Sequence, residues 1–229
     1  MTEHTVRAFS VELEELSGEL SSMGGKVEDM LSDAISAAVS ADPRLAEDVV
    51  LRDPEIDAYQ IDIERRILRL LALRQPLARD LRHTVAALKI AGDLERIGDL
   101  SKNIAKRALA MENVDAGRLK GVSRMGRLVA AQLKRVLDAY SAADTDGAAQ
   151  VWFRDEEVDE HYNSLFRELL TYMMEDHRTI GGCTHLLFIA KNLERIGDHC
   201  TNIAEVIHFL VTGEAMTSER PKVDDLERS

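Results

Sequence analysis

The stretch Leu94-Glu95-Arg96-Ile97-Gly98-Asp99 recurs without change as Leu193-Glu194-Arg195-Ile196-Gly197-Asp198, 99 residues further along the chain. Downstream of each copy, Asn103-Ile104-Ala105 recurs as Asn202-Ile203-Ala204 at the same separation. Self-similarity at one fixed separation is typical of an internally duplicated chain. The chain is therefore expected to consist of two related halves.

A second block repeats upstream at a slightly different separation. Met23-Gly24 matches Met125-Gly126, and Arg52-Asp53 matches Arg154-Asp155, each 102 residues apart. The three-residue difference between the two separations is expected to fall in one connection, around Leu73–Ala78. Elements that keep their length while a connection changes are typical of duplicated domains, since loops tolerate insertions better than the elements they join.

Each half is expected to form three long helices, because apolar residues recur at steps of three and four along it. Asp42-Pro43 is expected to cap and start the second helix, and Gly213 to end the last one. The predicted helices cover residues 5–40, a second helix from residue 43 to the interruption at Gln75-Pro76, and residues 77–111, 120–143, 146–175 and 179–211. The expected fold is all-α, with two tandem, pseudo-repeated, antiparallel three-helix bundles: residues 1–116, residues 117–213 and a disordered tail at 214–229.

Composition restricts the class of protein. Of the 229 residues, 45 % are hydrophobic, 31 % are charged and only 4 % are aromatic, which is typical of a folded helical chain and not of a β-sandwich or a disordered protein. The formal net charge is −12. Phosphate backbones repel such a surface, so we expect no nucleic-acid partner, whereas cations would bind to it readily.

Targeting features point to the cytoplasm. The first 19 residues contain five glutamates and no apolar run, so no signal peptide is expected. No apolar stretch approaches the length of a membrane span. The two cysteines, Cys183 and Cys200, are too few for a disulfide framework.

Paired carboxylates are the most informative motif. At about 100° per residue, Glu95 and Asp99 lie one turn apart on the face of their helix opposite to the apolar stripe, so we expect them on the solvent side. The spacing i, i+4 is repeated by the other acidic pairs, and the full set of candidate ligands is Asp53, Asp57, Glu95, Asp99, Asp155, Asp159, Glu194 and Asp198.

Two interpretations of these pairs remain open at this point. Like charges four residues apart destabilise a helix slightly, so their recurrence in both halves favours a bound cation that offsets the repulsion. Carboxylates from adjacent helices suit Fe, Mn, Mg or Ca, and Zn as well. Exposed carboxylates at this spacing are nevertheless common on solvated surfaces, so spacing alone does not separate metal binding from an ordinary acidic face.

No catalytic motif is present in the sequence. There is no Gly-rich phosphate loop, no nucleophile elbow and no zinc-protease motif. A di-metal carboxylate enzyme is the alternative in the enzyme class, and it is disfavoured because such bundle enzymes project their acids into the core. A helical adaptor without metal is the third hypothesis.

The repeated Leu-Glu-Arg-Ile-Gly-Asp with its trailing Asn-Ile-Ala resembles the signature of the PhoU family, the accessory proteins of bacterial phosphate-specific transport. The segment Gln75–Arg82 resembles the stretch that enters the third helix in this family, and Asp53–Asp57 and Asp155–Asp159 resemble its second-helix motif. One departure is that the second half reads Asp176-His177-Arg178-Thr179 where the first has the Gln-Pro entry.

The resemblance implies two three-helix bundles that carry a multinuclear metal cluster (Fe, Zn, Mn or Mg) on the eight acidic residues, and no catalytic turnover. It also implies a negative regulator of the phosphate-starvation response. Its partners would be the ATPase subunit of the phosphate ABC transporter and a phosphate-sensing histidine kinase, and it would reach the membrane only through them. From the apolar remainder on the outer helices, we further expect a homodimer.

Overall fold

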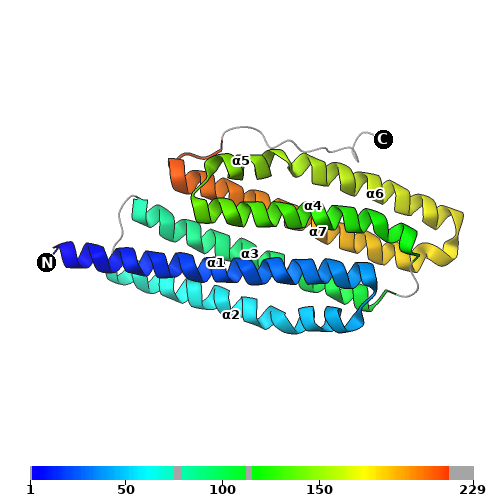
Figure 1. Ribbon diagram of the computed structural model, residues 1–229, viewed down its shortest axis with the longest axis horizontal. Coiled ribbons are helices and arrows are strands. Elements are labelled where there is room, and N and C mark those ends of the chain that lie inside the picture. The colour runs from blue at the N-terminus through cyan, green and yellow to red at the C-terminus, as the bar shows by residue number, and fades with distance from the viewer. Residues whose placement is uncertain (1, 75–78, 112–114, 217–229) are drawn as a thin grey trace.

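The computed structural model describes residues 2–74, 79–111 and 115–216. Within these ranges the chain contains helices and no strand, which confirms the all-α class. Figure 1 shows the long helices lying along the longest dimension of the molecule, with α1–α3 in one half and α4–α7 in the other. The elements are α1 (Thr2–Ser40), α2 (Pro43–Arg74), α3 (Arg79–Leu109), α4 (Ala116–Ala142), α5 (Thr145–Phe153), α6 (Asp155–Glu175), the short 3₁₀ turn η1 (His177–Thr179) and α7 (Ile180–Thr212).

The predicted helix ends follow from local capping chemistry. The Asp42 carboxylate accepts hydrogen bonds from the backbone N–H groups of Arg44 and Leu45, at 3.0 and 3.2 Å, at the start of α2. This confirms the expected cap, and an aspartate at such a position satisfies donors that the helix leaves unpaired. Gly213 ends α7 with a φ of 81°, a left-handed conformation that glycine adopts at little cost.

The single helix expected over residues 146–175 is wrong, because the chain breaks at Arg154 between α5 and α6. The preceding Trp152 is buried, and its indole N–H donates to the Glu205 carboxylate of α7 at 3.1 Å. Both α5 and α6 pack against α7. The equivalent residue of the first half, Arg52, lies inside the continuous helix α2.

The two halves pack against each other through equivalent surfaces. A Cβ atom added at Gly24 of α1 would lie 2.7 Å from Leu137 of α4, and one added at Gly126 of α4 would lie 2.7 Å from Ile35 of α1. Positions 24 and 126, like 35 and 137, are 102 residues apart. The contact of α1 with α4 is therefore approximately two-fold symmetric, and α3 and α7 form the second contact between the halves.

The expected boundary between residues 116 and 117 falls at the start of α4, beside its capping residue Asp115, and the domain limits remain predictions. The connection at 75–78 and the tail from residue 217 onward lie outside the described residues, so the disorder expected for the tail is not described. A search of the helices in the described ranges finds none long and apolar enough to cross a membrane.

Candidate functional site

The acidic residues of the first half lie where α2 packs against α3. Asp53 is buried, with 9 % of its side chain exposed, and the side chains of Glu95 and Asp99 are 15 % and 31 % exposed. The expectation that Glu95 and Asp99 face solvent is therefore only partly right. The reason is that α3 packs against three helices, α1, α2 and α7, so only a narrow strip of its surface reaches water.

Lys102 bridges this first acidic set. Its ammonium Nζ lies 2.6 Å from Asp53 Oδ2 and 2.6 Å from Asp99 Oδ1, and so ties α2 to α3. Burial lowers the pKa of Lys102, but the hydrogen bonds to Asp53 and Asp99 outweigh it, and the net pKa is raised. The lysine is thus a permanent cation between two of the predicted ligands.

The pKa of the Glu95 carboxyl group reflects its burial and the negative charges around it. Burial is the largest cause that raises the pKa of its carboxyl group, and Arg96 acts in the opposite direction. The negative charges of Asp99, Asp57 and Asp53 raise the pKa further. The packing of α2 on α3 therefore brings all four predicted residues of this half into one electrostatic neighbourhood.

The second acidic set lies where α6 packs against α7. Asp155 is 2 % exposed. A Cβ atom added at Gly197 would lie 3.5 Å from Asp155 Oδ1 and 3.4 Å from the amide oxygen of Gln132. The absence of a side chain at Gly197, between Glu194 and Asp198 on α7, therefore lets both oxygens approach the α7 backbone closely.

The second half differs from the first in its positive charges. Thr201 occupies the position that Lys102 has in the first half, and its hydroxyl group donates to the Gly197 carbonyl of its own helix at 2.9 Å. Glu194 instead pairs with Lys191 at 2.8 Å from the preceding turn. No lysine from α7 is therefore inserted between α6 and α7 at the position equivalent to Lys102.

The two sets differ in how well they fit a metal ion. In the part of the chain that the structure describes, no group of three or more histidine, cysteine, aspartate or glutamate side chains is arranged to hold an ion. In the first set, Lys102 already occupies the space between Asp53 and Asp99. In the second, Gln132 Oε1 and Glu194 Oε2 are buried without a hydrogen-bond partner among the described residues. Amide and carboxylate oxygens are the kinds of ligand that hard cations prefer. In this structure, however, Lys191 pairs with Glu194 in the second set, and Lys102 pairs with Asp53 and Asp99 in the first.

Sequence reasoning missed the polar link between the halves. His199 Nδ1 on α7 lies 2.8 Å from Asp93 Oδ1 on α3, and the Asn202 amide donates to the same oxygen at 3.4 Å. The counterpart of His199 in the first half is the apolar residue Leu100. The signal was present in the mismatch itself: a polar residue that replaces an apolar one in a duplicated core helix needs a partner.

Comparisons with known proteins agree with this architecture. The family model described as "PhoU domain" matches residues 20–108 and again 122–207. The chain is 57 % identical over the full length of both chains to a Caulobacter vibrioides protein named "Phosphate-specific transport system accessory protein PhoU homolog". A Rhizobium meliloti protein of the same name is 47 % identical, over 96 % of this chain and 94 % of the relative. The crystal structure of PhoU from Pseudomonas aeruginosa superimposes with a TM-score of 0.85 at 38 % identity, covering 90 % of this chain and 100 % of the other.

Proposed function

Because this chain belongs to the PhoU family, we propose that it is a negative regulator of the phosphate-starvation response that works as an adaptor. Its partners are the ATPase subunit of the phosphate ABC transporter and a phosphate-sensing histidine kinase. The observation that carries this proposal is the 57 % identity, over the whole length of both chains, to a relative named as an accessory protein of phosphate-specific transport.

The adaptor acts by binding and not by catalytic turnover. Its acidic sets lie at the two equivalent seams of the molecule, between α2 and α3 and between α6 and α7. They are repeated and partly open to solvent, and concentrated negative charge of this kind is costly to leave without a counter-charge. We therefore infer that these two seams are the zones that meet the partner proteins.

Metal binding belongs to this proposal as a property of the second seam. Glu194, Asp198, Asp155 and Asp159, with the Gln132 amide oxygen, would hold a hard or borderline cation such as Fe, Zn, Mn or Mg. When bound, the ion would supply positive charge on an acidic surface and so accept acidic or polar groups of a partner.

The first seam would bind a metal only after Lys102 withdraws. Its ligands would then be Asp53, Asp57, Glu95 and Asp99, which match the second set position by position. The protein is further proposed to be a cytoplasmic homodimer that reaches the membrane only through its partners. Large apolar side chains on the outer helices, among them Leu68 and Met174, are well exposed and provide surface for self-association.

A pull-down from phosphate-replete cells tests the adaptor role. The tagged full-length chain is expected to retain a transporter ATPase and a histidine kinase. The variant Glu194→Ala with Asp198→Ala tests the second acidic seam. It is expected to fold and to lose at least one of the two partner proteins. Recovery of neither partner with the unaltered chain would contradict the proposal.

A further inference from the structure

An arginine held between two carboxylates occupies the outer side of the first half, where α1 meets α2. Arg52 Nη2 lies 2.6 Å from Asp33 Oδ2, and Arg52 Nε lies 3.0 Å from Asp48 Oδ2. The guanidinium group therefore forms ion pairs with two carboxylates of its own half.

The equivalent positions of the second half carry the opposite charge balance. At a separation of 102 residues, Arg52 corresponds to Arg154, whereas Asp33 and Asp48 correspond to Arg135 and Gln150. Arg135 Nη1 donates to Gln150 Oε1 at 3.1 Å. Among the described residues, no carboxylate lies within ion-pair distance of either guanidinium group. Two arginines thus stand where the first half has one arginine and two acids.

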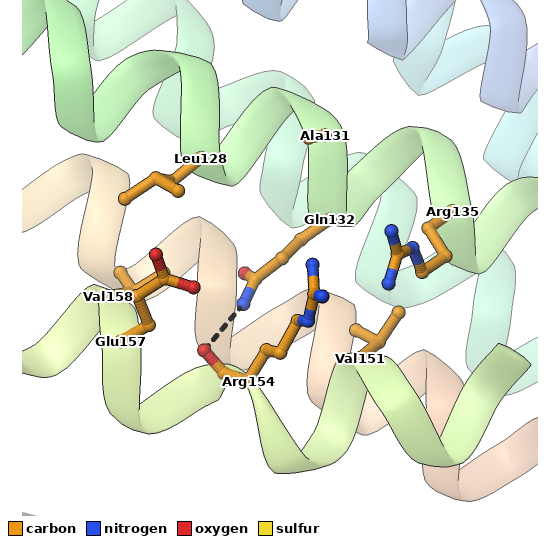
Figure 2. A pocket seen from close by; sticks show the side chains of 8 residues that line it. All are labelled: Leu128, Ala131, Gln132, Arg135, Val151, Arg154, Glu157 and Val158. Carbon is orange, nitrogen blue, oxygen red and sulfur yellow. Dashed lines mark hydrogen bonds between the residues drawn. The ribbon is translucent and has the colours of Figure 1, made fainter.

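These arginines border a small cavity between α4 and the α5–α6 break. The cavity has a volume of about 50 Å³, and Figure 2 shows the guanidinium groups of Arg135 and Arg154 on the same side of it, above Val151. Aliphatic side chains form much of its wall, and Val151 and Val158 are fully buried. Arg135 is half-buried and Arg154 is exposed, so a ligand can reach both guanidinium groups from solvent.

One acidic residue also lines the cavity. In Figure 2 the Glu157 carboxylate lies at the opposite end from the two guanidinium groups, beside Val158. Its counterpart Glu55 pairs with Lys26 at 2.8 Å, but the counterpart of Lys26 is Leu128. The six equivalent positions therefore carry two cations and four anions in the first half and two cations and one anion in the second. The first-half residues are Lys26, Asp29, Asp33, Asp48, Arg52 and Glu55, and the second-half residues are Leu128, Ala131, Arg135, Gln150, Arg154 and Glu157.

We propose that Arg135 and Arg154 bind inorganic phosphate at this cavity, with Gln150 beside Arg135 in place of a carboxylate. Guanidinium groups present paired N–H donors whose geometry matches phosphate oxygens, and they stay charged at every physiological pH. The cavity has room for a ligand of a few heavy atoms and not for a peptide. On a chain with a net charge of −12, two adjacent cations without acidic partners form a local site for an anion.

The proposal stands on the arginine geometry and not on the role in phosphate signalling. The adaptor could act without this site, and the site could bind phosphate in a protein with another role. The adaptor role is tested in cells, and the phosphate site is tested by titration of the purified protein. A negative result in one test therefore leaves the other proposal standing.

Calorimetric titration of inorganic phosphate into the full-length chain tests the proposal. The chain is first treated with EDTA, so that phosphate cannot bind through a metal at the nearby acidic seam. Saturable binding of one phosphate per chain is expected. Arg154→Ala is expected to weaken the affinity by at least about tenfold, and so is Arg135→Asp combined with Gln150→Asp, which restores the acidic pattern of the first half. The control is Lys134→Ala, which removes one positive charge beside Arg135 and should leave the affinity unchanged.

Four outcomes would overturn the proposal. They are no binding at phosphate concentrations up to about 10 mM, variants that bind as the unaltered chain does, displacement of phosphate by equimolar acetate, and binding only of a phosphoserine peptide. Circular dichroism of each variant checks that it is folded.

Discussion

At the scale of single residues, the two halves differ most in what neutralises their carboxylates. In the first half the Lys102 ammonium lies 2.6 Å from both Asp53 and Asp99. In the second half Thr201 stands at that position, and its hydroxyl group binds its own helix. An ammonium group and a metal ion compete for the same oxygens, so the duplicated acidic pairs need not have the same ligand.

Replacing Lys102 by Thr makes the first acidic set resemble the second. If the second set alone binds metal in the unaltered chain, Lys102→Thr should raise the metal bound per chain about twofold. Elemental analysis after dialysis measures this ratio. The control is Lys106→Thr, an exposed lysine one turn further along α3, which should change nothing. An unchanged metal content in Lys102→Thr would show that the lysine does not block a site.

Glu95 provides a prediction for pH dependence. Burial raises the pKa of its carboxyl group, so folding favours the protonated form. The stabilising contribution is complete below the ordinary pKa and is lost as the pH rises through the higher value of the folded state. Glu95→Gln should therefore raise the free energy of unfolding at pH 7 by roughly 0.3–0.5 kcal/mol. The gain should vanish below a pH of about 4.3. Urea unfolding at several pH values measures both, and a variant that is less stable at pH 7 would contradict the assignment.

At the scale of elements, the helix ends could be predicted because they depend on neighbouring residues. The Asp42 cap and the Gly213 end are examples of local chemistry that a sequence displays. The break at Arg154 lies beside Trp152, whose indole group binds Glu205, 53 residues away, and no local pattern in the sequence indicates that contact. The candidate site follows the same rule: spacing places Glu95 and Asp99 one turn apart, but the burial of Asp53 and the position of Lys102 depend on how α2 packs on α3.

Substitutions at two glycines allow the effect of helix packing on stability to be measured separately from the effect of helix propensity. A Cβ atom added at Gly126 would lie 2.7 Å from Ile35 Cγ2, and a β-branched side chain cannot easily move aside. Gly126→Ala should therefore lower the free energy of unfolding by about 1–2 kcal/mol.

The matched control is Gly25→Ala on α1, where nothing lies within 4 Å of the added atom. This substitution should raise the free energy of unfolding by about 0.5–1 kcal/mol, because alanine favours helix more than glycine does. Urea unfolding of the two variants measures the difference. Equal effects in both variants would show that the α1–α4 contact is not tight.

At the scale of the whole molecule, the chain is built like a dimer of its two halves. The contact of α1 with α4 repeats itself across an approximate two-fold axis, and the contact of α3 with α7 carries the polar link between Asp93 and His199 and the stacking of Arg107 on Phe188. The equivalent surfaces of α1 and α4, and those of α3 and α7, are thus buried against each other within one chain. Any further self-association must use the outer helices.

Light scattering tests that self-association. We expect a homodimer with twice the 25.6 kDa mass of one chain, held through apolar side chains on the outer helices. Because apolar burial drives the association, exchanging an exposed apolar residue such as Met174 for Glu should shift the equilibrium toward the single chain. A mass of 25.6 kDa for the unaltered protein at micromolar concentration would contradict the dimer.

We propose that this chain represses the phosphate-starvation response through its acidic seams. The most direct test measures a phosphate-starvation reporter in rich phosphate, in cells that lack the gene and carry either the unaltered copy or one with Glu95, Asp99, Glu194 and Asp198 all changed to Ala. These residues lie outside the apolar core, so the variant should stay folded. We expect the reporter to be on in the deletion strain, off with the unaltered copy and on with the folded quadruple variant. Full repression by the quadruple variant would contradict it and place the regulatory surface elsewhere on the molecule.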